Sequence, residues 1–180
     1  GSWSQSSADD LDWTIDANGT PSNSTGPASA TDGSYYIYME VSGNGTGFPN
    51  KRAILNSPCF DLSGQSGASV TFDYHMTGNA VGTIDLEVSS DNGNNWTSVW
   101  SRSGDQGTAW NNANIDLSTY AGETLLLRFN GVSGSSWQGD IAIDNFELSG
   151  STPGGSINCS STVTAPYSEG FESNFGGWTQ

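Results

Sequence analysis

The chain has 180 residues and a formal net charge of −15, because 19 acidic residues stand against four basic ones. This length fits one domain with a sizeable core, and the scarcity of Lys and Arg argues against nucleic acid as a partner, since phosphates bind clustered basic side chains. No apolar run is long enough to cross a bilayer, so membrane insertion is not expected.

Short apolar runs with a period of two, separated by clusters of Gly, Asn, Asp, Ser and Pro, predict an all-β sandwich. The alternation is clear at residues 35–41, 69–76, 83–89 and 125–130. In the first of these, the pattern assigns Tyr35 to the core and Tyr36 and Tyr38 to the outside. An Asp91-Asn92-Gly93 turn is expected to join strand 83–89 to a strand at 96–101, because Asn-Gly accepts the positive φ of tight turns.

Polar side chains share one face of the predicted strands. We expect strand 69–76 to lie beside strand 83–89, so that their polar positions form one surface. Sugars stack on exposed aromatic rings and bond to planar polar side chains, so such a surface indicates a polysaccharide site. The predicted ligand-binding residues are Asp73, His75, Asp85, Glu87, Arg128 and Trp137. The alternatives are an ordinary exposed histidine at position 75 and a solvated acidic face.

Six groups of residues, in chain order, resemble the MAM domain (meprin, A5 antigen, receptor tyrosine phosphatase mu). They are Asp12-Trp13-Thr14, Thr20-Pro21-Ser22 with Thr25-Gly26-Pro27, Gly33-Ser34-Tyr35-Tyr36-Ile37-Tyr38-Met39-Glu40, Ala53-Ile54-Leu55-Asn56-Ser57-Pro58, Phe72-Asp73-Tyr74-His75-Met76 with Gly82-Thr83, and Gly139-Asp140-Ile141-Ala142-Ile143-Asp144. The resemblance covers residues 3–148. It implies a jelly-roll β-sandwich of two antiparallel sheets that serves as a non-catalytic recognition or adhesion module in extracellular proteins.

The two ends of the chain nearly repeat each other. Gly176-Gly177-Trp178-Thr179-Gln180 matches Gly1-Ser2-Trp3-Ser4-Gln5, which predicts a slice of a bacterial tandem array. The family's opening Phe-Glu segment is missing before Trp3 and stands instead at Phe171-Glu172. We therefore assign residues 1–148 to the MAM-like sandwich, 149–166 to a linker rich in Gly, Ser and Pro, and 167–180 to the start of a following repeat.

The segment 159–180 is predicted to dock as the missing first strand, because a sandwich without that strand exposes a sheet edge. The receiving sheet is that of the same chain, of a neighbouring repeat or of a second copy. The alternative is a disordered linker. Cys59 and Cys159 are the only cysteines and permit one disulfide. Cys159 has an alternative partner in the next repeat, and two unpaired thiols are the third possibility.

A structural calcium ion is expected, because clustered carboxylates and Gly-rich loops supply the oxygen ligands that calcium takes. Jelly-roll modules often hold such an ion between the first strand, the next loop and the final strand. On this sequence the predicted ligands are Asp32, Asp140, Asp144 and Glu172. The alternative is that these are solvated turn residues.

The sequence predicts a binding module and not an enzyme. It contains one histidine and no Ser/His/Asp or Cys/His signature. The predicted function is that of a carbohydrate-binding module in a secreted, multidomain, polysaccharide-degrading protein. The alternative is a protein–protein adhesion module, which a sizeable exposed apolar patch would favour.

Overall fold

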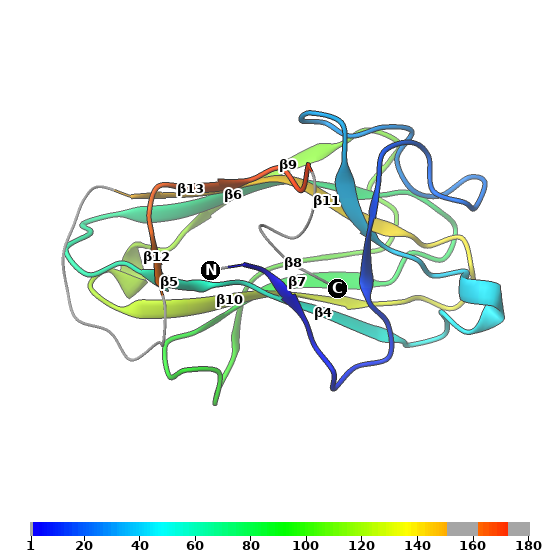
Figure 1. Cartoon of the computed structure of the whole chain (residues 1–180). Coiled ribbons are helices and arrows are strands. Elements are labelled where there is room, and N and C mark those ends of the chain that lie inside the picture. The colour runs from blue at the N-terminus through cyan, green and yellow to red at the C-terminus, as the bar shows by residue number, and fades with distance from the viewer. Residues whose placement is uncertain (1, 151–161, 173–180) are drawn as a thin grey trace.

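Two β-sheets stacked face to face make up the described part of the molecule (Figure 1). A computed structural model describes residues 2–150 and 162–172. Its strands are accompanied by two short 3-10 helices, η1 (Gly43–Gly45) and η2 (Ser118–Tyr120). The strands are antiparallel except for the short parallel pair β12–β5 and one isolated bridge. The predicted all-β jelly-roll sandwich of two antiparallel sheets is confirmed.

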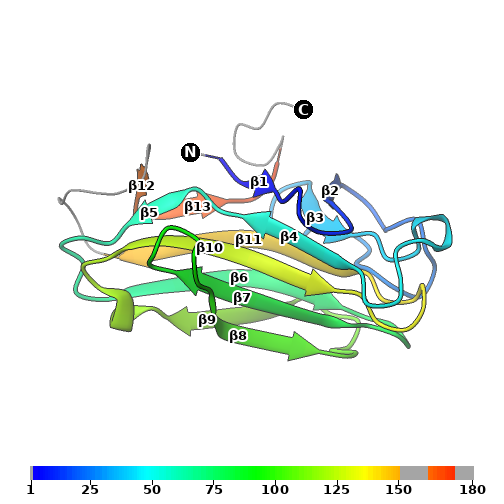
Figure 2. The ribbon, with the colours of Figure 1, turned by 90° about the horizontal axis from the view of Figure 1, so that it is seen from below.

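The first sheet, here called sheet A, is built around the long strand β10 (Figure 2). One edge of β10 pairs with β7, which pairs with β8, and its other edge pairs with β4 and β5 in succession. The members of sheet A are β1 (Ser4–Gln5), β4 (Arg52–Asn56), β5 (Cys59–Asp61), β7 (Thr83–Ser89), β8 (Thr97–Ser103), β10 (Thr124–Val132) and β12 (Thr162–Thr164). Strand β1 extends the sheet beyond β4, and β12 extends it beyond β5.

The second sheet, sheet B, is built around β11. One edge of β11 pairs with β6, followed by β9, and its other edge pairs first with β3 and then with β13. The members of sheet B are β2 (Trp13–Asp16), β3 (Tyr36–Met39), β6 (Ala68–Met76), β9 (Asn111–Asp116), β11 (Ile141–Gly150) and β13 (Tyr167–Glu169). The pairing of β11 with β6 is irregular between Asp144 and Glu147, where Asn145 has a φ of 50°.

The core lies between the sheets and is rich in aromatic rings. Phe129 of sheet A meets Phe72 and Phe146 of sheet B edge-on, with ring centroids 5.0 and 6.1 Å apart. Trp3 stacks on Phe129 at 5.6 Å. Edge-to-face ring pairs bury large apolar surfaces in a favourable geometry, so these contacts hold the two sheets together.

The predicted pairing of strands 69–76 and 83–89 is wrong. These segments are β6 and β7, and they belong to different sheets. Both strands bury alternate side chains in the same core, but they do so from opposite sides. Alternation identifies which face of a strand is buried, but it does not show to which sheet the strand belongs. The pattern therefore could not tell neighbouring strands of one sheet from strands of opposite sheets.

The outer side of sheet B is covered, where the sequence had predicted a polar face. Tyr36 and Tyr38 are buried there in a second apolar cluster with Ala142, against Ala30 and Trp110. The β2–β3 loop, residues 17–35, supplies Ala30 and lies over this side of the sheet (Figure 1). Tyr36 and Tyr38 thus point away from the main core, as the alternation predicts, but they are covered and not exposed to solvent. The prediction that Tyr35 is core is wrong. Tyr35 is 40% exposed.

The segment 162–172 packs back onto the sandwich. In Figure 1 it passes from β12 on sheet A to β13 on sheet B. Phe171 is fully buried, and its ring meets Trp3 edge-on at 6.2 Å. Strand β11 continues to Gly150 and β12 spans Thr162–Thr164, so residues 149–150 and 162–164 of the predicted linker lie in strands. The repeat motif at 176–180 lies outside the described residues.

Cys59 lies buried in β5. No cysteine among the described residues is free. Cys159, the predicted partner of Cys59, lies outside the described residues, so their pairing stays a prediction. No helix in the described parts of the chain is long and apolar enough to cross a membrane.

Candidate functional site on the outer face of sheet A

The outer face of sheet A carries a row of planar polar side chains. On β10, Leu127 and Phe129 point into the core, so Arg128 and Asn130 point outward. The register places Glu87 of β7 directly opposite Arg128. Cross-strand neighbours lie about 5 Å apart, so the three polar groups meet on the surface.

Hydrogen bonds join these side chains into one network. Arg128 Nε donates to Glu87 Oε2, and Asn130 Nδ2 donates to Glu87 Oε1 at 3.3 Å. From β4, Arg52 Nε donates to Asn130 Oδ1 at 2.8 Å. The side chains of Arg128 and Glu87 are 16% and 15% exposed. The network is thus held in a fixed geometry while part of its edge faces solvent.

An indole ring completes the surface. The Arg128 guanidinium lies 4.1 Å from the centre of the Trp96 ring, a distance at which cation and ring attract each other. Trp96 Nε1 donates to Gly93 O at 3.1 Å. The turn before it holds Asn92 and Gly93 at φ of 59° and 85°, as the Asn-Gly signal predicts. We call the group Arg52, Asp85, Glu87, Trp96, Arg128 and Asn130 the sheet A site.

A β-bulge explains why Trp96 faces outward. Leu86 pairs with Trp100, but Glu87 pairs with Ser98, so the register shifts and Val99 is the extra residue. Trp100 meets the core ring of Phe72 at 4.9 Å. Simple alternation puts positions 96 and 100 on one face, whereas the bulge sends them to opposite faces. Sequence reasoning therefore missed Trp96, and it also missed Arg52 and Asn130.

Three of the six predicted ligand-binding residues come together in the sheet A site: Asp85, Glu87 and Arg128. Asp85 Oδ1 accepts a hydrogen bond from Ser98 Oγ at 2.8 Å. Asp73 lies on sheet B, where Asn112 Nδ2 donates to its Oδ1 at 2.8 Å. The prediction of one shared surface is wrong for this residue, because β6 belongs to the other sheet.

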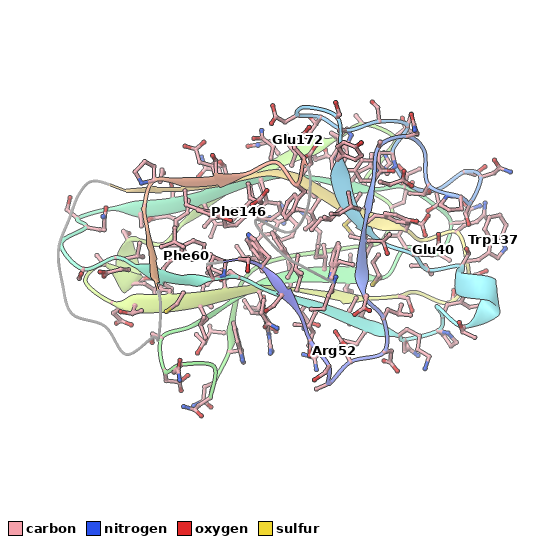
Figure 3. All side chains as sticks on the ribbon, viewed as in Figure 1. Glu40, Arg52, Phe60, Trp137, Phe146 and Glu172 are labelled. Atoms are coloured by element: carbon pink, nitrogen blue, oxygen red, sulfur yellow. The ribbon has the colours of Figure 1, made fainter. Side chains whose placement is uncertain are left out.

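His75 and Trp137 are also outside the sheet A site. His75 is 2% exposed, beneath Trp110 at a ring distance of 5.5 Å. The prediction that it is exposed is wrong, because the β2–β3 loop and Trp110 cover this part of sheet B. Trp137 is 41% exposed, as predicted, but Figure 3 shows it at the end of the sandwich, away from Arg52.

The carboxylates predicted to bind calcium fall into two places. Asp144 Oδ2 accepts the backbone N–H groups of Thr31 and Asp32 at 2.8 and 3.0 Å. Glu172 accepts from the backbone of Ser34, with a shorter distance of 2.8 Å. Asp144 and Glu172 thus hold one loop from two sides, and the Glu172 carboxylate lies at the top of the molecule in Figure 3.

Gly33 lies at the centre of this contact. A Cβ at position 33 would stand 2.2 Å from the Glu172 carboxyl carbon, and the φ of Gly33 is 60°. Both the space and the backbone conformation therefore require glycine. The fit shows that the tail carboxylate and the loop are closely matched.

Asp140 lies apart from this pair. It is four residues before Asp144 on the chain, which corresponds to about 13 Å along extended backbone. Its Oδ1 accepts from Val41 N at 3.0 Å, while its buried Oδ2 has no partner among the described residues. Burial raises the pKa of both aspartates to about 6.

No group of three or more His, Cys, Asp or Glu side chains within the described residues is placed to hold a metal ion. Oxygen ligands do suit calcium, and Asp32, Asp144 and Glu172 surround the same loop. Calcium at these three residues stays a prediction, and Asp140, just before β11, lies apart from them.

The comparisons with known proteins agree with this architecture. The family model for the MAM domain, meprin/A5/mu, matches residues 1–153. The chain belongs to the MAM domain family. It is 34% identical over 178 residues to MAM domain-containing glycosylphosphatidylinositol anchor protein 1 from Rattus norvegicus. That match covers 92% of this chain and 18% of the relative, so this MAM domain spans less than a fifth of the relative's length.

Solved structures show the same fold at low sequence identity. The K1 cleaved adhesin domain of Lys-gingipain from Porphyromonas gingivalis W83 has a TM-score of 0.60 and 17% identity, covering 83% of this chain and 91% of that one. TmCBM61 in complex with β-1,4-galactotriose has a TM-score of 0.52 and 21% identity, covering 83% and 87%. These likenesses report on the β-sandwich alone, because one scaffold hosts many unrelated sites.

Proposed function

We propose that this MAM domain is a carbohydrate-binding module that holds a neutral polysaccharide on the sheet A site. The observation that carries the proposal is the ordered row of guanidinium, carboxylate and amide groups beside the Trp96 indole. Such groups donate to and accept from sugar hydroxyls, and an indole packs against the apolar face of a sugar ring. A rigid network binds with little loss of side-chain entropy.

Charge supports a neutral ligand. The chain carries a net charge of −15, so its field repels a sulfated or carboxylated polymer. Within the sheet A site, Arg128 is already paired with Glu87 and its charge is largely offset. A neutral glycan is not repelled by the net negative charge, and it does not need an unpaired cationic side chain for binding.

The surface offers less support for the alternative, a protein adhesion module. Among the described residues, the large hydrophobic side chains that are exposed are Tyr35 and Trp137. A stable protein interface usually has a contiguous apolar centre, and two residues do not make one. Adhesion remains the second candidate, because the adhesin domain of Lys-gingipain shares the fold.

The wider setting belongs to the same proposal: a secreted, multidomain, polysaccharide-degrading protein in which this domain binds and does not catalyse. An extracellular location is supported by relatives that are named as glycosylphosphatidylinositol anchor proteins. Glycan binding near a catalytic domain would raise the local concentration of substrate.

Affinity electrophoresis in gels cast with neutral and acidic polysaccharides tests the proposal. The wild-type domain should be retarded by at least one neutral polymer, and Arg128→Ala should weaken that retardation by about tenfold or more. Arg102→Ala is the matched control, because it removes the same charge from an exposed position on β8. It should bind like the wild type.

Two results would overturn the assignment. If Arg128→Ala and Arg102→Ala lose equal affinity, the sheet A site is not where the glycan binds. If no polymer of the panel retards the wild type, the hypothesis of a protein adhesion module replaces that of a carbohydrate-binding module.

A further inference from the structure

The sheet A site extends across four neighbouring strands. Strands β4, β10, β7 and β8 lie side by side in that order (Figure 2). Arg52 lies on β4, Asn130 on β10, Asp85 on β7 and Ser98 on β8. Because neighbouring strands are about 4.8 Å apart, three spacings give this row of polar side chains a length of about 14 Å. The site therefore runs across the strands and is longer than a single side-chain pair.

The part of the row on β4 and β10 carries unused hydrogen-bond donors. A guanidinium has five N–H groups and accepts no hydrogen bond. Arg52 uses its Nε group on Asn130, and Arg128 uses its Nε group on Glu87. The N–H groups on the terminal nitrogens of both arginines have no hydrogen-bond partner among the described residues. A ligand at this end must therefore accept hydrogen bonds.

The part of the row on β7 offers an unused acceptor. Asp85 Oδ1 accepts from Ser98 Oγ at 2.8 Å, whereas no described residue donates to Asp85 Oδ2. A carboxylate only accepts, so a ligand must donate here. Strands β4 and β7 are two spacings apart, which is about 10 Å. A ligand that uses both Arg52 and Asp85 must accept at one point and donate at another over that distance.

A single sugar ring does not cover this distance. Its hydroxyl groups both donate and accept, but one ring spans about one strand spacing. In a polysaccharide, each further ring adds a length close to that spacing and brings a new set of hydroxyl groups. A run of about three rings therefore matches the three spacings between β4 and β8.

We propose that the sheet A site binds three or more consecutive sugar residues of a neutral polysaccharide, with the sugar chain lying across β4, β10, β7 and β8. This mode of binding rests on the proposed function of the site. The sugar residue over β4 accepts from Arg52, the next lies beside Arg128 and the Trp96 ring that it contacts, and the residue over β7 and β8 donates to Asp85. A monosaccharide fills one of these positions and leaves the others unused.

A series of oligosaccharides tests the chain length directly. The series contains one to six rings of the polymer that retards the wild-type domain most, and ¹⁵N NMR titration gives each dissociation constant. The constant should fall by about tenfold or more from the monosaccharide to the trisaccharide or tetrasaccharide. It should then level off, because longer chains extend beyond the row. Equal constants for the monosaccharide and the hexasaccharide would overturn the proposal.

A variant at one end of the row tests the direction of the sugar chain. Arg52→Ala should weaken hexasaccharide binding by about tenfold and leave disaccharide binding almost unchanged, because a disaccharide can lie over β10 and β7 without reaching β4. Lys51→Ala is the matched control. It removes the same charge from the preceding residue, which is paired with Asp10 at 3.2 Å, and it should bind every length like the wild type.

The same variant can contradict the proposal. If Arg52→Ala weakens binding of the disaccharide and of the hexasaccharide by the same factor, Arg52 acts only by holding Asn130 in place and no sugar residue lies over β4.

Two results distinguish a wrong chain length from a wrong function. If a neutral polymer retards the wild type and all lengths bind equally, the domain still binds glycan but takes a single sugar residue. If no polymer of the panel retards the wild type, the proposed function is wrong and the extended mode of binding is wrong with it.

Discussion

The His75 imidazole is enclosed by Trp110 and the backbone of Thr108. Desolvation is the main cause that lowers its pKa, while the hydrogen bond to Thr108 and the charge of Asp105 act in the opposite direction. A charged ring in this place would lose hydration without gaining a salt bridge. The folded state therefore favours the neutral ring.

The first prediction concerns this pKa. The NMR titration midpoint of His75 should lie below the usual value of about 6.5. Because the folded pKa is lowered, the unfolded chain binds the proton more readily, and stability should fall as pH decreases from about 6.5 through the folded pKa. Urea unfolding of wild type and His75→Gln at several pH values measures the difference. A midpoint at or above 6.5 would contradict the buried, neutral assignment.

A residue can be placed from the sequence when its position depends on neighbouring residues in its own strand, and not when it depends on distant segments. Asp85, Glu87 and Arg128 were predicted because each alternates with core residues in its own strand. Trp96 required knowledge of the bulge at Val99, which shows only when β7 and β8 are paired. The burial of His75 depends on a loop some 50 residues away in the chain, and no local pattern records it.

At the scale of elements, segment 162–172 completes both sheets. Strand β13 pairs with β11 through Tyr167, Ser168 and Glu169, and Phe171 fills a place in the core beside Trp3. The sequence predicted a docked tail from the position of Phe171-Glu172. The docking in this structure is to the chain's own sheets.

The second prediction concerns how much segment 162–172 contributes to the free energy of unfolding. Phe171→Ala should lower the free energy of unfolding by about 3–5 kcal/mol, because it removes a fully buried ring. Ser168→Ala, an exposed position on the same segment, should change it by less than about 0.5 kcal/mol. Chemical denaturation of both variants gives the comparison. Equal, small effects would mean that the tail does not support the core.

The third prediction concerns calcium at Asp32, Asp144 and Glu172. If these carboxylates bind the ion, calcium should raise the melting temperature relative to chelator, since a ligand that binds only the folded state stabilises it. Glu172→Gln should abolish the increase, whereas Glu147→Gln, at an exposed position of β11, should retain it. Identical melting curves with calcium and with chelator would contradict the prediction of a calcium site.

Strand positions were predictable and strand partners were not. The segment 83–89 coincides with β7, and the Asn-Gly turn after it is present. Alternation and turn chemistry are local, so they set these boundaries. The assignment of β6 and β7 to opposite sheets comes from long-range pairing with β11 and β10, for which a single sequence carries little signal.

At the scale of the whole molecule, charge is the dominant property. A net charge of −15 on 180 residues means that the folded chain repels itself as well as acidic polymers. At 0.1 M ionic strength, salt screens the repulsion between exposed charges that lie more than about 10 Å apart. The domain therefore should become more stable as salt is added.

The fourth prediction follows from that repulsion. Raising sodium chloride from low to physiological concentration should increase the melting temperature, and it should leave binding of a neutral glycan almost unchanged. Scanning calorimetry and affinity electrophoresis in the same buffers measure the two quantities. A melting temperature that falls with salt would show that local ion pairs, such as Arg128–Glu87, outweigh the overall charge.

The most direct test of glycan binding on sheet A is to map the contact residue by residue. We would titrate the ¹⁵N-labelled domain with an oligosaccharide of the polymer that retards it most and record backbone and indole shifts. We expect the largest shifts to cluster on β4, β7 and β10 and to include the Trp96 indole. Shifts confined to other faces, or no shifts with any oligosaccharide of the panel, would contradict it.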